Sequence, residues 1–213
     1  MGENIRISVI MPVYLGYYEF EVHKAASDPE EKFKRAVRSF LNQTLKNSEL
    51  IIISDGDNDV IEICWEEFGF ENRVDYHLIE KQPLYGGKVR QEGVNRARGG
   101  IICYLDHDDY FGANHLQTIS DNFNTSEVDW VYYDDYLIRS ADHKTIQKRN
   151  VKPLQNVIGT SAIAHKRSIP VVWEDGNTHD WLLISKYLLG RPSVKIPTPE
   201  YYVCHNSGLN MDF

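Results

Sequence analysis

The sequence predicts an α/β protein whose central sheet is largely parallel and covered by helices on both faces. Short apolar runs alternate with segments of helical periodicity through the first half of the chain. These runs are not interrupted by polar residues at every second position, so we expect strands buried on both faces. Polar clusters follow several of the runs, and ligands of parallel sheets bind beyond the carboxyl ends of the strands.

The composition is typical of one folded globular protein. The 213 residues fit a single domain, and 42% hydrophobic with 25% charged residues exclude a disordered chain. The longest apolar runs, Leu50–Ile53 and Ile101–Leu105, are too short to cross a bilayer, and no secretory signal pattern is visible. Three scattered cysteines lack metal or redox spacing. We therefore expect a cytoplasmic protein without a transmembrane segment.

The net charge of −8 limits the class of partner. Binding to nucleic acid irrespective of sequence depends on clustered lysine and arginine, so we expect no nucleic-acid partner. An anionic ligand would need a local positive group, and a bound metal ion is the simplest choice.

The first half is expected to follow the order β-α-β-α-β-α-β. A strand over Ile5–Val13 contains Pro12, which lacks the backbone donor of other residues. The segment Ser27–Glu30 has the pattern of a capping box with an early proline, and it begins a helix predicted over Asp28–Gln43. The elements that follow are a strand over Leu50–Ser54, a helix over Val60–Phe68, a strand over Val74–Ile79, a helix over Lys88–Arg98 and a strand over Ile101–Leu105.

After residue 110 the pattern changes to a mixture of elements. Helices are predicted near Asn114–Phe123 and over Leu182–Leu189, and strands over Val128–Ile138 and Ser193–Cys204. There is no internal repeat. We expect one domain over residues 1–213, with one half at 1–110 and a smaller mixed half at 111–213.

Two acidic clusters directly follow buried strands of the first half. The carboxylates of Asp106–Asp109 repel one another unless water or a cation shares them, and hard divalent cations prefer such oxygens. In the cluster Asp55–Asp59 a carboxylate can accept hydrogen bonds from a base or a ribose, and the glycine permits close approach. A solvated acidic turn would give either pattern, so each cluster by itself leaves both interpretations open.

The order and spacing of these motifs resemble the inverting family 2 glycosyltransferases, whose nucleotide-binding half has the fold called GT-A. The matching segments, which cover about the first half of the chain, are Ser8–Tyr14, Ser39–Thr44, Glu49–Gly56, Arg90–Gly93, Ala97–Gly100 and Tyr104–Asp109. The resemblance implies a GT-A type fold with a nucleotide-sugar-binding half at 1–110 and an acceptor-side half at 111–213.

The resemblance also implies roles for residues of the first half. Pro12 and Tyr14 would line the nucleobase pocket, and Asp55 would bond the base, commonly uracil. Asp106 and Asp108 match the family's DXD motif, in which they would contact the donor and bind Mn²⁺ or Mg²⁺, with Asp108 the direct ligand. Arg90 falls in the segment that faces the acidic motif and the diphosphate, although a solvated surface arginine is an equal alternative.

Two residues of the second half match the family more loosely. Asp180, within Thr178–Leu183, takes the place of the catalytic base, although the same segment is also typical of a plain helix start. His205 takes a place where a histidine sometimes completes the metal site, although an isolated histidine is more often structural. Ser54 and His179 depart from the family pattern, because each stands where the family has an acid.

The predicted function is metal-dependent transfer of a sugar, with inversion, from a nucleotide-diphosphate donor to an acceptor hydroxyl. A UDP-sugar is favoured, and the acceptor is a carbohydrate, a lipid-linked sugar or a protein, as in polysaccharide biosynthesis. Two alternatives are a nucleotidyltransferase and a catalytically inactive protein that binds nucleotide sugars. The first lacks support because no glycine-rich phosphate loop follows the first strand.

Overall fold

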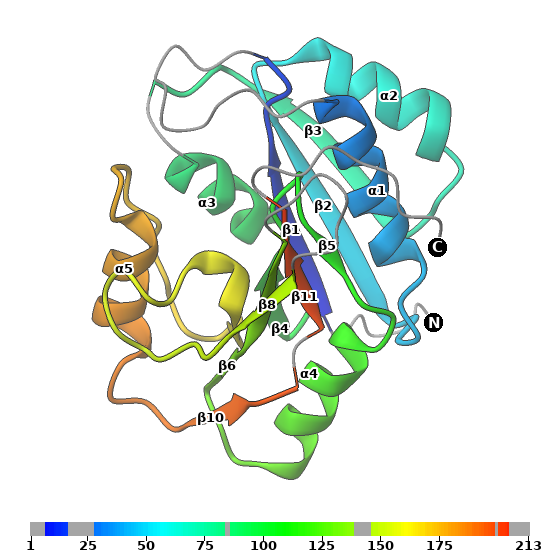
Figure 1. Cartoon of the computed structure of the whole chain (residues 1–213). Coiled ribbons are helices and arrows are strands. Elements are labelled where there is room, and N and C mark those ends of the chain that lie inside the picture. The colour runs from blue at the N-terminus through cyan, green and yellow to red at the C-terminus, as the bar shows by residue number, and fades with distance from the viewer. Residues whose placement is uncertain (1–6, 17–27, 84–85, 139–145, 199, 205–213) are drawn as a thin grey trace.

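The computed structural model describes residues 7–16, 28–83, 86–138, 146–198 and 200–204, which form two sheets and the helices around them (Figure 1). The strands are β1 Ile7–Val13, β2 Ser48–Asp55, β3 Val74–Ile79, β4 Ile101–Tyr104, β5 Tyr110–Phe111, β6 Trp130–Tyr133, β7 Asp135–Ile138, β8 Ile146–Arg149, β9 Ile163–Lys166, β10 Ser193–Ile196 and β11 Tyr201–Val203. The helices are α1 Pro29–Leu41, α2 Asn58–Phe68, α3 Gly87–Arg96, α4 His115–Thr125 and α5 His179–Leu183, with a 3-10 turn η1 Thr160–Ala162 and a π-helical turn η2 Ile184–Leu188.

The larger sheet confirms the predicted α/β fold with a largely parallel centre. Its strand order is β10-β6-β9-β4-β1-β2-β3. β1 pairs in parallel with β2 and β4, and β2 with β3, so the carboxyl ends of these four strands meet at one edge. β9 is antiparallel to both of its neighbours. Every residue of β2 is buried, as expected for a strand covered on both faces.

Helices lie on both sides of this sheet (Figure 1). α1 and α2, which connect β1 to β2 and β2 to β3, share one face because such crossovers are right-handed. α3 returns the chain from β3 to β4 and lies on the opposite face. A Cβ on Gly93 of α3 would lie 2.4 Å from Ile10 Cγ2, so the glycine lets this helix pack closely on β1.

The predicted helix start is displaced by one residue, the predicted strand over Ser193–Cys204 is wrong, and two predicted residues lie outside the described residues. Asp28 has a left-handed conformation (φ 60°, ψ 56°), and its side chain makes no capping hydrogen bond. Helix α1 begins at Pro29, where an N–H would have no intrahelical partner. The strand predicted over Ser193–Cys204 is divided between β10 of the larger sheet and β11 of the smaller. Ser27 and the predicted strand start at Ile5 lie outside the described residues.

The single strand predicted over Val128–Ile138 is also wrong, because it is two strands, β6 and β7, that belong to different sheets. The chain changes sheet at Asp134, whose buried carboxylate accepts the Val151 N–H at 2.9 Å and lies 2.7 Å from Lys195 Nζ. The Asp134 N–H donates to the Ile196 carbonyl at 3.2 Å. Asp134 thus binds distant residues at the point where the chain leaves the larger sheet. The smaller sheet has the order β5-β11-β7-β8 and supplies the mixed second half that was expected.

Candidate donor and active site

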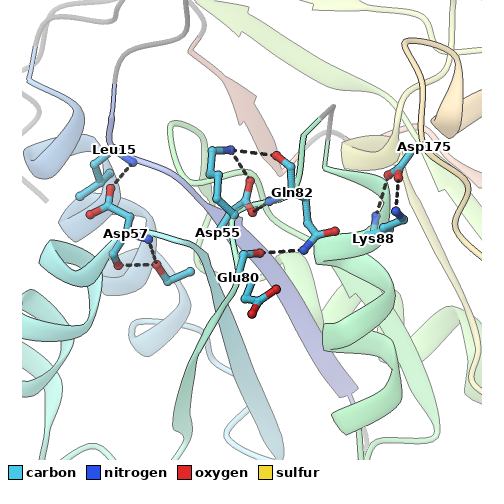
Figure 2. A network of polar contacts seen from close by, with 9 residues as sticks. Leu15, Asp55, Asp57, Glu80, Gln82, Lys88 and Asp175 are labelled. Carbon is cyan, nitrogen blue, oxygen red and sulfur yellow. Dashed lines mark hydrogen bonds and ion pairs between the residues drawn. The ribbon is translucent and has the colours of Figure 1, made fainter.

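Asp55 ends β2 at the carboxyl edge of the larger sheet, and both of its carboxylate oxygens accept hydrogen bonds (Figure 2). Lys81 Nζ lies 2.6 Å from Asp55 Oδ2, and the N–H of Gln82 lies 2.7 Å from Oδ1. The Lys81 ammonium also lies 4.0 Å from the centre of the Tyr14 ring. The predicted residues Tyr14 and Asp55 therefore meet through Lys81. Pro12 lies in β1, partly buried and paired with β2.

The turn after Asp55 is closed by Ser54 and Asp57. The Ser54 hydroxyl donates to the Asp57 carbonyl at 2.5 Å and accepts the Asp57 N–H at 3.2 Å. The Asp57 carboxylate in turn accepts the Leu15 N–H at 2.9 Å, which ties the segment after β1 to the turn after β2 (Figure 2). A hydroxyl can both donate and accept, whereas an ionised carboxylate can only accept. The departure at Ser54 thus has a structural reason.

The acidic run after β4 divides into one buried and two partly exposed carboxylates. Asp109 is 1% exposed, and it accepts the Tyr201 hydroxyl at 2.9 Å and the Cys204 N–H at 2.7 Å. Burial, followed by the charges of Asp108 and Asp106, raises the pKa of Asp109 well above its usual range. Asp106 and Asp108 are partly exposed. Asp109 therefore anchors the turn, and the two predicted ligands remain at the surface.

Arg90 lies on α3 and is only 8% exposed, so the alternative of a solvated surface arginine is wrong. Its guanidinium lies 2.6 Å from Asp106 Oδ1 and 3.3 Å from His179 Nε2. Burial alone would lower the pKa of Arg90, but the charges of Asp106 and Asp180 raise it above its usual value. A permanent buried cation therefore lies between the acidic motif and the segment that carries Asp180.

Asp180 is the second residue of α5, and its carboxylate is directed at Thr160 and His179. Oδ1 accepts the Thr160 hydroxyl and lies 2.8 Å from His179 Nε2. Burial alone would raise the pKa of Asp180, but the hydrogen bond from His179 and the charge of Arg90 lower it well below its usual value. These contacts favour an ionised carboxylate held in one orientation over a simple helix start.

His179 makes polar contacts through both ring nitrogens. Nδ1 lies 2.6 Å from the Gly176 carbonyl. Nε2 lies 2.8 Å from Asp180 Oδ1 and 3.3 Å from the Arg90 guanidinium. The histidine in place of the family's acid thus lies between Arg90 and Asp180.

Asp106 and Asp108 suit a divalent cation. They are two residues apart on one turn, and with Asp109 they place three carboxylates within four consecutive residues. Hard cations prefer such oxygens, and water or diphosphate oxygens would complete the coordination. Across the described ranges no group of three or more His, Cys, Asp or Glu side chains forms a metal cluster. His205, the third predicted ligand, lies outside those ranges.

Sequence reasoning missed three residues of this site: Lys81, Gln82 and Thr160. Lys81 and Gln82 follow the end of β3, so the same strand-end rule that identified Asp55 could have identified them. Thr160 lies in η1, 20 residues before Asp180, and no motif surrounds it.

The domain is a glycosyltransferase domain by its similarity to known proteins. The family model described as Glycosyl transferase family 2 matches residues 8–178, and the chain therefore belongs to this family. It is 28% identical over 115 residues to glycosyltransferase GlyA of Streptococcus pneumoniae serotype 4, covering 54% of this chain and 14% of that protein. It is 32% identical over 114 residues to an uncharacterized glycosyltransferase of Haemophilus influenzae, covering 52% of this chain and 39% of that protein. The matched part is thus well under half of either relative.

Solved structures share the fold at low sequence identity. S. aureus TarS 1-349 in complex with UDP-GlcNAc superposes with a TM-score of 0.73 at 14% identity, covering 97% of this chain and 60% of TarS. The mannosyltransferase PcManGT from Pyrobaculum calidifontis, in complex with GDP-Man and Mn²⁺, has a TM-score of 0.64 at 13% identity. The match covers 93% of this chain and 56% of PcManGT. These similarities confirm the predicted GT-A type fold.

Proposed function

We propose that this chain transfers a sugar, with inversion, from a nucleotide-diphosphate donor to an acceptor hydroxyl, and that the donor is a UDP-sugar. The observation that carries the proposal is the position of Arg90. One buried guanidinium contacts Asp106 of the acidic motif at 2.6 Å and lies 3.3 Å from His179, the neighbour of Asp180. In this proposal residues 1–110 are the donor half and residues 111–213 the acceptor half of a single domain.

The donor would bind along the carboxyl edge of the larger sheet. Pro12 and Tyr14 would line the nucleobase pocket, and Asp55 would accept an N–H of the base. Asp106 and Asp108 would hold Mn²⁺ or Mg²⁺, which when bound offsets the negative charge that develops on the leaving nucleoside diphosphate. The UDP-GlcNAc complex of TarS and the Mn²⁺ complex of PcManGT support these assignments by shared fold.

Asp180 would take the proton of the acceptor hydroxyl. Thr160 and His179 hold Oδ1. Oδ2 lies 3.4 Å from where a Cβ would stand on Gly159, so the lack of a side chain there leaves room beside this oxygen. A hydroxyl is a poor nucleophile at neutral pH, and a positioned base contributes roughly 10²–10⁴ in rate. Attack opposite the leaving group would invert the anomeric configuration.

The acceptor is proposed to be a carbohydrate, a lipid-linked sugar or a protein, and the location to be cytoplasmic. The cysteines support the location, because Cys64, Cys103 and Cys204 are all buried and form no disulfide with one another. Burial raises the pKa of the Cys64 thiol to about 12, which makes it unreactive. Within the part of the chain that the structure describes, no helix has the length and apolarity needed to span a membrane.

A thermal-shift screen of nucleotide sugars with and without Mn²⁺ tests the proposal, followed by an assay of the product released. The true donor should raise the melting temperature most, because a ligand stabilises the folded state with the logarithm of its saturation. Release of nucleoside diphosphate is expected. Release of inorganic diphosphate would indicate nucleotidyl transfer, and binding without release across a broad acceptor panel would indicate an inactive binding protein. Either result would contradict the proposal.

A further inference from the structure

The segment after β3 packs tightly against the turn after β2. Gly56 has φ +74°, and a Cβ on it would lie 2.6 Å from Lys81 Cβ and 2.9 Å from Lys81 Cα. The glycine is therefore required twice, for a backbone conformation that other residues rarely adopt and for the space that Lys81 occupies. In the β2–β3 register Asp55 stands opposite Ile79, two residues before Lys81. The backbones of two elements thus place Lys81 beside Asp55.

The Lys81 side chain connects both residues expected to contact the nucleobase. Its ammonium lies 2.6 Å from Asp55 Oδ2 and 4.0 Å from the centre of the Tyr14 ring. The N–H of the next residue, Gln82, donates to Asp55 Oδ1 at 2.7 Å, as Figure 2 shows. Asp55 is 7% exposed, so these bonds hold an almost buried carboxylate in one orientation. A fixed hydrogen-bond acceptor and a hydrogen-bond donor thereby lie side by side.

This pair retains the capacity to bind a ligand. A carboxylate has about four lone-pair sites, and the bonds from Lys81 and Gln82 use one site on each oxygen of Asp55. An ammonium carries three N–H donors on a flexible stem of four carbons. The Lys81 side chain is 42% exposed. It can therefore move from the Tyr14 ring to the edge of an incoming base while it remains within reach of Asp55.

We propose that Lys81 is a specificity-determining residue, which together with Asp55 selects a nucleobase that presents an N–H beside a carbonyl. Asp55 accepts the N–H, and Lys81 donates to the carbonyl oxygen. Uracil offers this edge, and so does guanine. Cytosine and adenine present an acceptor nitrogen beside an amino group. In the same pose the acceptor nitrogen would face the Asp55 carboxylate and the amino group would face the Lys81 ammonium, so neither hydrogen bond could form. The inference rests on the donor role proposed for Asp55 and adds a residue outside the family's motifs.

Calorimetric titration with UDP, GDP, CDP and ADP in Mn²⁺ tests the inference. The unmodified protein should bind UDP or GDP more tightly than CDP and ADP. Lys81→Met should weaken binding of UDP and GDP about tenfold or more and leave CDP and ADP nearly unchanged. Lys81→Arg should retain the preference, because it keeps a charged donor. Lys46→Met is the matched control, because Lys46 precedes β2 at the opposite edge and donates to the Leu41 carbonyl at 3.2 Å.

Four results would overturn the inference. Unchanged or tighter binding of UDP and GDP by Lys81→Met would show that Lys81 does not read the base, and tighter binding would show that it obstructs the site. An equal loss for all four nucleotides would reduce its role to general attraction of an anion. A preference of the unmodified protein for CDP or ADP would reverse the proposed selection. If the folded, unmodified protein bound none of the four, the proposed function itself would fail, and this inference with it.

Discussion

Up to β4 the chain adds its strands to one sheet, whereas the rest of the chain divides its strands between two. β1, β2 and β3 are neighbours joined by α1 and α2. β6 and β7 are consecutive yet belong to different sheets, and the same is true of β10 and β11. A repeated βα unit follows one local pattern, but a change of sheet depends on contacts with distant residues. The candidate site lies where the two regions meet, at the contact of Arg90 with His179.

The largest expected effect is that of Asp180→Asn, which tests the contribution of the second region to the chemistry. Transfer should fall by roughly 10²–10⁴, because positioned base assistance acts in the transition state. Donor binding, which the first region is proposed to supply, should change little, whereas the melting temperature should fall, because asparagine lacks the charge that faces buried Arg90 and pairs with His179. Initial rates, calorimetry and thermal melts measure the three quantities.

Asp175→Asn is the matched control for that variant. Asp175 lies five positions before Asp180, and its carboxylate already pairs with Lys88 Nζ at 3.2 Å, so transfer should survive its neutralisation. Near-normal transfer by folded Asp180→Asn would disprove the assignment of the base. Glu174 would then become the next candidate, and Asp175 as well if its own variant lost transfer.

Asp108→Ala should remove the dependence of nucleotide binding on a divalent cation. Without Asp108 the metal ion is held poorly, and the remaining acids of the turn repel the diphosphate. The affinity for nucleotide in Mn²⁺ should therefore fall by about 100-fold, toward the affinity measured in chelator. Glu66→Ala, at an exposed acid on α2, removes the same charge and should bind nucleotide normally. Equal affinity of the unmodified protein in chelator and in Mn²⁺ would contradict the role of the metal.

Asp55→Ala should weaken donor binding by about 1.5–3 kcal/mol and relax the preference for one base, because a charge-assisted hydrogen bond is lost. The transfer rate at saturating donor should hardly change, which is the opposite of the result expected for Asp180→Asn. Calorimetry with several nucleotides and rates at high donor concentration separate the two effects. If the variant bound each nucleotide as the unmodified protein does, Asp55 would have no part in reading the base.

The smallest expected effect concerns stability in acid. Among the described residues, the buried histidines, His115 and His165, both lie in the second region. Burial lowers the pKa of His115 to about 3 and that of His165 to about 4, against about 6.5 in the unfolded chain. Below about pH 6.5 the unfolded chain therefore binds more protons, and the free energy of unfolding falls as the pH falls.

His115→Phe isolates one of these two contributions. Phenylalanine keeps the ring stack against Phe111, whose centroid lies 4.3 Å from that of His115. Between pH 7 and pH 5, the free energy of unfolding of the variant should fall by about 2 kcal/mol less than that of the unmodified protein. Urea unfolding at both pH values measures the difference. The same loss in both proteins would show that His115 is not the source of the acid sensitivity.

The sequence predicted where some of the candidate residues lie, and these predictions share a cause. Asp55 is the last residue of β2 and Asp106 comes two residues after the end of β4, so their place at the carboxyl edge follows from the strands themselves. The burial of Arg90 could not be predicted from the sequence, because the pattern of its helix is also consistent with an arginine at the surface. The pairing of His179 with Asp180 could not be predicted either, because an acid near the start of a helix is common without any catalytic role.

By itself, the sequence determined the order of strands and helices through β4 and the acids at the strand ends, because apolar periodicity and turn chemistry depend only on near neighbours. Only the tertiary structure decided which side chains meet. Lys81 and Asp55 are 26 residues apart, and Arg90 and His179 are 89 apart. The change of sheet at Asp134 likewise depends on Val151 and Lys195. Such partners are selected by how the elements pack together, and that information is not contained in any local stretch of the chain.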